Sequence, residues 1–312
     1  MSRLRVIVVG LGVQGQKRRA VAGDDVVATV DPVHPEANFK SLQDVPLSSY
    51  DAALLCVPDE PKIALITYLA ENRKSLLVEK PLLGTSARSG AELAALAKLV
   101  RESGITCYTA YNHRFEPHFV RMHELIRSGE LGEIYSLRMF YGNGTARLVR
   151  NSEWRDRHAG VLPDLGSHLL DTLQFWLGDI RSEFVLWSAS CFENLAFDHV
   201  TFGASGRPLL QCEITLLSWR NHFYADVFAE RGSAHISSLC KWGPSTFTVR
   251  RRVLPSGRPP EENITLVQAD PTWTLEYEHF KSLCRTGGSN ISNDLWISGV
   301  LEKLAQAGGV SP

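Results

Sequence analysis

The 312-residue sequence predicts an α/β protein, with a doubly wound parallel sheet in its N-terminal part followed by an α+β part built on a largely antiparallel sheet. Three observations predict this class. Short apolar segments alternate with helical ones up to about residue 114. A glycine-rich turn at 10–15 directly follows the first apolar segment. From about 182 to 270, strand-like segments follow one another with only turns between them, which favours antiparallel pairing.

The N-terminal part alternates strands and helices. Five short apolar runs are typical of strands buried on both faces, and we expect strands at 5–10, 26–31, 52–57, 75–79 and 106–111. We expect a helix that ends near residue 22 and further helices over 60–71 and 86–103. This alternation predicts a parallel sheet with crossover helices.

The pattern changes after about residue 114, and we therefore expect two domains, 1–114 and 115–312. Helices are expected over 116–128, 163–177, 272–285 and 292–307. Pro163 is typical of a helix start, and Gly178 of a helix end. Strands are expected at 133–141, 184–190, 199–204, 209–219, 224–230, 234–239, 246–253 and 264–268. The segment 255–260 is interpreted as a loop.

Composition gives no reason to expect nucleic-acid binding, a cysteine-based metal site or a membrane-spanning segment. The net charge of −1 gives no reason to expect a nucleic-acid partner, and the basic runs 17–19 and 250–252 are interpreted mainly as solvated faces. Six scattered cysteines without C-x-x-C spacing predict neither a metal site nor a disulfide framework. The first apolar run is too short for a signal peptide, and no apolar stretch approaches the ~20 residues that span a bilayer. We expect a cytoplasmic protein with no membrane partner.

The turn after the first strand matches G-x-G-x-x-G at Gly10, Gly12 and Gly15. In this pattern the first glycine allows a tight turn, the second lets a pyrophosphate approach the backbone, and the third lets the helix pack on the strand. The helix start, with Val13 and Gln14, then presents free N–H groups to the phosphates. The motif therefore predicts a dinucleotide site of the Rossmann type.

Asp31 ends the second strand, about 20 residues after the glycine turn, where an acid can accept hydrogen bonds from the adenosine ribose. A carboxylate there would repel a 2′-phosphate, and no arginine adjoins it to receive one. We therefore expect NAD as the cofactor, with NADP less favoured. The alternative interpretation of Asp31 is a turn-forming aspartate before Pro32.

Two further strand ends complete the expected cofactor site. Val57 and Pro58 end the third strand, and Glu79 and Lys80 end the fourth. Ligands of open α/β sheets bind outside the carboxyl ends of the strands. Lys80 is therefore expected to point its amine at the reactive end of the cofactor.

The segment Glu79-Lys80-Pro81, with 111–115, 128–134, 164–168 and Asp171, resembles the glucose–fructose oxidoreductase/inositol dehydrogenase (Gfo/Idh/MocA) family over nearly the whole chain. The resemblance implies an N-terminal Rossmann domain and a C-terminal domain with an open sheet that often mediates oligomerisation. It implies that Lys80 lies beside the nicotinamide and the substrate hydroxyl, that Pro81 is cis, and that Asp164 and His168 line the substrate pocket. The sequence departs from the family where Pro61-Lys62 replaces a common histidine near the nicotinamide ribose.

Asp164 and His168 are four residues apart on an expected helix, so their side chains should share one face. Gly166 lies between them, and a close backbone approach would explain it. As a hypothesis, His168 takes the hydroxyl proton as hydride leaves to NAD, Lys80 stabilises the developing alkoxide, and Asp164 orients the substrate or His168. Lys80 could instead be the base, because burial lowers the pKa of a lysine.

Four weaker candidates offer hydrogen bonds and an aromatic surface for a sugar or polyol. They are Asn112, Arg114, Trp154 and Arg155. The alternative interpretation of each is a residue of a surface helix or loop.

The leading hypothesis is an NAD-dependent oxidoreductase that acts on a hydroxyl of a sugar, nucleotide sugar or cyclic polyol. Two alternatives stay open: a non-catalytic NAD-binding regulator of the same fold, and an NAD-assisted glycoside hydrolase. Large apolar residues in the antiparallel strands, among them Trp187, Trp219 and Phe223, predict a homodimer or homotetramer through one face of the C-terminal sheet.

Overall fold

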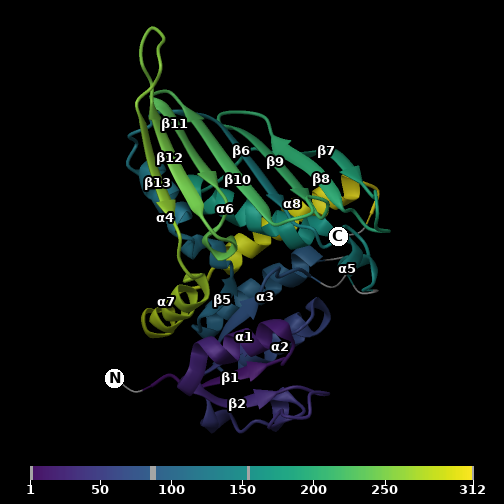
Figure 1. The fold of residues 1–312 in the computed structure, drawn as a ribbon. Helices are drawn as coiled ribbons and strands as arrows, with labels where there is room; N and C mark the ends of the chain where they lie inside the picture. Colours follow the sequence, from purple (N-terminus) through teal and green to yellow (C-terminus); the bar gives the residue numbers. More distant parts are fainter. Residues whose placement is uncertain (1–2, 85–88, 153–154, 311–312) are drawn as a thin grey trace. The chain divides into compact units, whose positions relative to one another are not determined.

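The computed structural model describes residues 3–84, 89–152 and 155–310, and the chain forms two compact units (Figure 1). The first unit consists of 1–112 and 272–298, and the second of 113–271 and 299–312. The split near residue 112 lies close to the expected domain boundary. The return of 272–298 to the first unit was not anticipated, because helical periodicity does not show which core a helix joins.

The first unit contains a five-stranded parallel sheet in the order β2-β1-β3-β4-β5. Its strands are β1 (Val6–Val9), β2 (Val26–Val30), β3 (Ala52–Leu55), β4 (Ser75–Glu79) and β5 (Cys107–Ala110). Its helices are α1 (Val13–Ala22), α2 (Asp59–Glu71), α3 (Ser89–Ser103), α7 (Thr272–Thr286) and the start of α8 (Ile291–Ala307). The predicted Rossmann-like sheet is confirmed.

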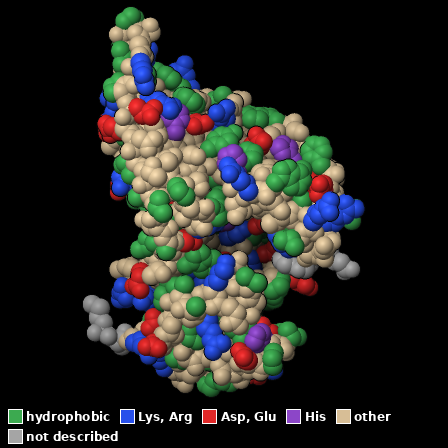
Figure 2. Space-filling view, in the orientation of Figure 1, with side chains coloured by type: hydrophobic (Ala, Val, Ile, Leu, Met, Phe, Trp, Pro, Cys, Tyr) green, Lys and Arg blue, Asp and Glu red, His purple; other side chains and the backbone are tan. Residues whose placement is uncertain are grey.

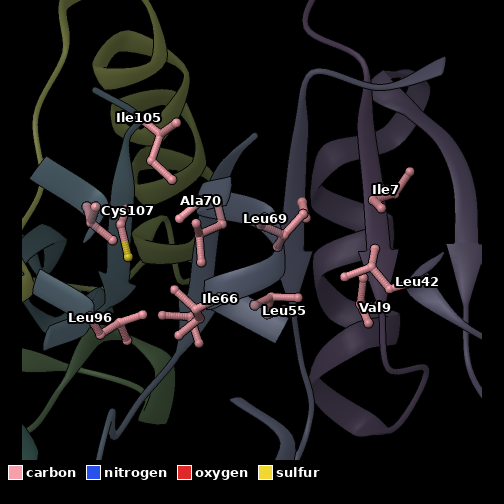
Figure 3. Packing of buried hydrophobic residues seen from close by; sticks show 14 of the residues in the cluster. Ile7, Val9, Leu42, Leu55, Ile66, Leu69, Ala70, Leu96, Ile105 and Cys107 are labelled. Carbon is pink, nitrogen blue, oxygen red and sulfur yellow. The ribbon is translucent and has the colours of Figure 1, made fainter. Parts of the chain in front are cut away.

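Both faces of this sheet are buried, which explains the continuous apolar runs in the sequence. Alternate residues such as Ile7 and Leu55 point to one face and pack with Ile66 and Leu69 of α2 (Figure 3). The strand order reverses at β1, since β2 lies on one side of it and β3 on the other. Such a switch point is where open α/β sheets bind their ligands.

The second unit contains an eight-stranded sheet in the order β13-β12-β11-β10-β6-β9-β8-β7. Its strands are β6 (Ile134–Gly142), β7 (Phe184–Ser190), β8 (His199–Ala204), β9 (Leu209–Thr215), β10 (His222–Ala229), β11 (Gly232–Ser237), β12 (Ser245–Arg251) and β13 (Glu261–Leu266). Within the described ranges, β6 and β9 form the one parallel pair of this sheet. The predicted, largely antiparallel open sheet is confirmed.

The helices of this unit are α4 (Pro117–Arg127), α5 (Ala146–Arg150) and α6 (Ser167–Leu177), and α4 and α6 lie behind the sheet in Figure 1. The indole N–H of Trp176 in α6 donates to the carbonyl of Phe119 in α4 (3.0 Å). Along β10, residues from Phe223 to Ala229 alternate between buried and partly exposed. This alternation is typical of a sheet with one covered and one solvated face.

Histidine, basic and hydrophobic side chains lie together on the solvated face (Figure 2). Trp187 is 46% exposed, whereas Phe223 is fully buried. The sequence-based assignment of Phe223 to an uncovered face was therefore wrong, because its place in the alternation of β10 turns it toward the helices.

Two further expectations need correction. The strand expected to run to Trp219 ends at Thr215, whose hydroxyl accepts a hydrogen bond from the amide of Leu217 (3.1 Å) and turns the chain. Trp219 follows in a left-handed conformation with φ 60° and is 71% exposed. Arg18, expected on a solvated face, is 1% exposed, since it is paired with the partly buried Glu79 and the fully buried Glu276. No helix in the described part of the chain is long and apolar enough to cross a membrane.

Candidate active site

The three glycines of the turn after β1 have different steric reasons to be glycine. Gly10 has φ 88°, and a Cβ atom there would overlap the carbonyl of Cys56. A Cβ atom at Gly15 would overlap the carbonyl of Gly10, so α1 could not pack at its observed distance. A Cβ atom at Gly12 would meet nothing within 4 Å. Packing within the protein thus requires glycine at positions 10 and 15, whereas the space beside Gly12 is open.

The start of α1 faces the same open space. Gly12 is the N-cap, and Val13 and Gln14 in the first turn are exposed. No side chain among the described residues caps this helix, and its first turn carries no acidic residue. The backbone N–H groups and the partial positive charge of the helix start are therefore available to an anion.

Asp31 lies directly after β2 and is 9% exposed. Its Oδ2 accepts the amide of Leu11 (2.8 Å), and its Oδ1 accepts the amides of Val33 (2.9 Å) and His34 (2.8 Å). Burial acts to raise the pKa of Asp31, but these three hydrogen bonds outweigh it and hold the pKa below its ordinary value. Asp31 therefore forms the turn that the alternative interpretation predicted, and it remains an anion beside the glycine turn.

Val57 and Pro58 follow β3 at the same edge of the sheet. The Val57 side chain packs partly into the core, and Pro58 is the exposed N-cap residue of α2. Cys56 just before them is mostly buried, and burial raises the pKa of its thiol well above the ordinary value. The thiol is therefore protonated and not a nucleophile at neutral pH.

Lys80 follows β4, is half-buried, and precedes a cis peptide bond to Pro81, as the resemblance implies. Glu79 accepts a hydrogen bond from Arg18 Nε (2.6 Å). Because β1, β3 and β4 are parallel, the glycine turn, Val57 and Lys80 all follow strand ends at one edge of the sheet.

In the second unit, Asp164 and His168 do not lie on one regular helix as expected. Leu162–Gly166 forms a π-helical turn, and α6 begins only at Ser167. The simple four-residue spacing argument therefore fails, because the π turn changes the number of residues per turn. Single π turns within helices are frequent at functional sites.

Gly166 is not explained by a close backbone approach. A Cβ atom there would lie 3.3 Å from Leu162, 3.4 Å from Ile214 and 3.6 Å from Leu301, each time against the end of a side chain. The expectation was therefore wrong, since tight apolar packing in the second unit occupies that space.

His168 is buried within a group of aromatic rings that the site prediction did not include. His113 stacks on it with ring centroids 4.1 Å apart and an interplanar angle of 20°. The ring of Tyr141 lies 5.9 Å from that of His168 and 5.5 Å from that of His113. Burial, and then the charge of Asp164, raise the pKa of Tyr141, so its phenol stays protonated. The segment 111–115 contained His113, but no sequence spacing links it to His168.

The structure gives partners to three of the four weaker candidates. Asn112 donates from Nδ2 to Thr272 (2.8 Å). Arg114 forms a bidentate pair with buried Asp171, with Nε and Nη2 at 2.9 and 2.7 Å from its oxygens. Arg155 lies 3.6 Å from Asp164 Oδ2. Trp154 lies outside the described residues. Asp164, His168, Arg114 and Arg155 are thus grouped in the second unit, and the glycine turn, Lys80 and Asn112 belong to the first.

Comparison with known proteins agrees with this fold. Residues 119–235 match the family described as "GFO/IDH/MocA C-terminal domain". The scyllo-inositol 2-dehydrogenase (NAD(+)) of Bacillus subtilis (strain 168) is 26% identical over 94% of this chain and 90% of that protein. Residues 119–235 therefore belong to the Gfo/Idh/MocA C-terminal domain family, and the whole chain resembles an oxidoreductase.

Two further proteins match, one over a shorter stretch and one at lower identity. The inositol 2-dehydrogenase of Rhizobium meliloti (strain 1021) is 27% identical over 49% of this chain, which spans 41% of that protein. A solved levoglucosan dehydrogenase in complex with NADH has a TM-score of 0.83 at 17% identity, covering 100% of both chains. At this identity the structural likeness shows the fold.

Proposed function

We propose that the protein is an NAD-dependent dehydrogenase or reductase that transfers a hydride between nicotinamide and a hydroxyl-bearing carbon of a sugar, nucleotide sugar or cyclic polyol. One observation carries the proposal. The glycine turn, with open space at Gly12, and Lys80 after β4 follow strand ends at the same edge of one parallel sheet. A regulator that only binds the cofactor has no need of Lys80, Asp164 and His168 together.

The relatives support the substrate class. The names of those that match include inositol 2-dehydrogenases and a levoglucosan dehydrogenase, which are enzymes of a cyclic polyol and of an anhydrosugar. The residues proposed to meet the substrate (Asp164, His168, Asn112, Arg114, Arg155 and Trp154) are polar or aromatic, which suits a ligand rich in hydroxyl groups. The particular sugar or polyol is the question for experiment.

The cofactor residues favour NAD over NADP. We propose Gly10, Gly12, Val13, Gln14, Gly15, Asp31, Val57, Pro58, Glu79 and Lys80 as the cofactor-binding set. The carboxylate of Asp31 stays ionised, and Oδ2 makes one backbone hydrogen bond, so it can still accept one from a ribose hydroxyl. A 2′-phosphate would meet this anion. Titration calorimetry with NAD and with NADP tests the preference, and tighter binding of NADP would overturn it.

The proposed chemistry oxidises an alcohol. NAD, when bound, accepts the hydride from the carbinol carbon, and the hydroxyl proton passes to a protein base. We propose that the base is His168, held by the stack with His113, and that Lys80 donates a hydrogen bond to the same oxygen and stabilises its developing negative charge. Asp164 orients the substrate or His168. The exchange of roles between Lys80 and His168 is the alternative assignment.

We further propose that the solvated face of the eight-stranded sheet joins copies of the chain into a homodimer or homotetramer. On this face Arg138 of β6 and His235 of β11 both bond the carboxylate of Asp226 in β10, at 2.8 and 2.7 Å. Phe140 and Tyr224 stack beside them with centroids 5.3 Å apart. Side chains fixed across neighbouring strands form a rigid surface, as an interface requires. A cytoplasmic location stays a prediction.

The activity is tested by NAD reduction with a panel of inositols, sugars, anhydrosugars, uronates and nucleotide sugars. We expect turnover confined to one class of compound. Binding of NAD without turnover of any compound would favour a regulator, and release of a glycosyl product without net NADH would favour an NAD-assisted hydrolase.

A further inference from the structure

The two residues that flank Lys80 in the chain are each bonded by a buried cation from a different helix. Arg18 of α1 donates from Nε to the carboxylate of Glu79 (2.6 Å). Lys62 of α2 donates from Nζ to the backbone carbonyl of Pro81 (2.7 Å). Arg18 is 1% exposed and Lys62 is 2% exposed. Lysine and arginine are rarely this buried, and when they are, they hold specific partners.

Lys80 lies where the sheet no longer fixes the backbone. The last paired residue of β4 is Glu79, opposite Ala110 of β5, and Lys80 follows in a bend. The path of the backbone at Lys80 therefore depends on what holds Glu79 before it and Pro81 after it. Arg18 and Lys62 provide one contact on each side.

Arg18 is itself fixed on several sides. Its Nη2 lies 2.7 Å from Glu276 Oε2, and its guanidinium lies 4.2 Å from the centre of the Trp273 ring. Burial alone would lower the pKa of Arg18, but the charges of Glu276 and Glu79 more than reverse this effect. The planar guanidinium can serve two carboxylates at once, which a lysine amine does less well. Because α1 also begins at the glycine turn, Arg18 connects that turn to the end of β4, directly before Lys80.

Lys62 reaches Pro81 from the first turns of α2. Its Nζ also lies 2.6 Å from Asp59 Oδ1, three residues earlier on the same helix. The Asp59 side chain is 52% exposed, so this pair faces solvent at one end and the Pro81 carbonyl at the other. Lys62 thus bonds the Pro81 carbonyl while its charge is balanced by a counter-ion on its own helix.

We propose that Arg18 and Lys62 are positioning residues that together hold Lys80 in the position from which it acts on the substrate. The inference deepens the proposed function, since it rests on Lys80 acting on the substrate. Neither cation is a catalytic residue in this account, because each acts through the backbone or the side chain next to Lys80.

Lys62→Met and Arg18→Lys are the test variants, since the first removes one contact and the second keeps a charge but cannot bridge both carboxylates. Lys74→Met is the matched control for Lys62, because Lys74 also donates to a carbonyl, that of Tyr50 (2.8 Å), but at the other end of β4. Lys17→Met is the control for Arg18. Lys17 precedes Arg18 on α1, and its Nζ also lies over the Trp273 ring, 5.2 Å from the ring centre. Lys62→Arg restores a long cationic donor.

The first readout needs no turnover. Hydrogen–deuterium exchange of the backbone amides of Lys80, Leu82, Leu83 and Gly84, without cofactor or substrate, should be about tenfold faster in both test variants and unchanged in both controls. Exchange rates in the test variants that equal those of the wild type, or exchange rates in the controls that rise as much as in the test variants, would overturn the inference. This readout distinguishes failure of the positioning inference from failure of the proposed function. Failure of the proposed function would show as absence of turnover in the wild type.

The second readout distinguishes positioning of Lys80 from a general destabilisation of the fold. We expect kcat of Lys62→Met to fall about tenfold, with a smaller loss of NAD affinity because Lys80 also belongs to the proposed cofactor-binding set, and Lys62→Arg to recover most of the kcat. A loss of NAD affinity as large as the loss of kcat in Lys62→Met, or an equal loss of kcat in Lys74→Met, would show that Lys62 only supports the fold.

Discussion

At the scale of single residues, one sequence motif contains positions with different physical roles. Gly10 and Gly15 are required by the backbone around them, and Gly12 is not. The motif therefore predicted the tight turn after β1, but only the structure separates the glycines that packing requires from the one that we propose approaches the cofactor.

This separation predicts opposite effects of two alanine substitutions. Gly12→Ala should change stability by no more than about 1 kcal/mol, because Gly12 is extended (φ −67°) with open space around it. It should weaken NAD binding about tenfold. Gly15→Ala should destabilise the fold by about 1–3 kcal/mol, because its Cβ atom would overlap the Gly10 carbonyl. Calorimetric melting and NAD titration measure both effects. Gly12→Ala with wild-type NAD affinity would contradict this account.

The stack of His113 on His168 predicts a second pair of effects. His113→Phe keeps an aromatic ring against His168 and should retain most turnover. His113→Leu removes the stack, worth about 0.5–1.5 kcal/mol for an aromatic pair, and should lower kcat up to about tenfold with NAD affinity unchanged. Steady-state kinetics of the two variants decide this. Equal losses would mean that the ring nitrogens of His113, rather than its stacking, matter.

At the scale of elements, the strands could be predicted from the sequence, whereas the π turn before α6 and the burial of Arg18 could not. Strand ends such as Glu79 follow from apolar runs, which burial on both faces requires. The π turn before α6 was missed, because the helical pattern of 163–177 does not reveal an extra residue in one turn. Burial of Arg18 was missed for a different reason: its partner Glu276 lies more than 250 positions away in the sequence.

The turn after β2 depends on the ionised carboxylate of Asp31, which predicts a pH effect. Its pKa is below the ordinary value in the folded protein, so ionised Asp31 stabilises the fold above its unfolded pKa, and this stabilisation is lost as the pH falls through the folded pKa. Asp31→Asn should cost about 1–2 kcal/mol at neutral pH, because it loses at least one charge-assisted hydrogen bond. The difference in melting temperature from wild type should shrink below about pH 4. A difference that stays constant with pH would argue against this role.

At the scale of the whole molecule, the consecutive order of the strands predicted a largely antiparallel open sheet, and the structure shows this sheet, with buried and partly exposed residues alternating along β10. The sequence could not assign each large residue to its face, since a shift of one residue reverses the side. Phe223 is the example, because it packs against the helices while Phe228 of the same strand is 43% exposed.

The solvated face predicts self-association. Light scattering should give a dimer or tetramer at micromolar concentration for the wild type. Phe228→Glu, which places a charge on this face near the turn from β10 to β11, should raise the dissociation constant at least about tenfold. Leu275→Glu on α7, at a position that is 46% exposed, is the matched control and should leave assembly unchanged. A monomeric wild type would refute the interface.

The central claim is that Lys80 and His168 carry out hydride-transfer chemistry on an alcohol with NAD bound at the glycine turn. The most direct measurement is NADH formation by wild type, Lys80→Ala and His168→Ala with the panel compound that the wild type oxidises, together with NAD affinity. The account predicts turnover lowered by about two orders of magnitude or more in both variants, with NAD affinity within about twofold for His168→Ala. Turnover that persists in either variant, or a wild type that does not bind NAD, would contradict it.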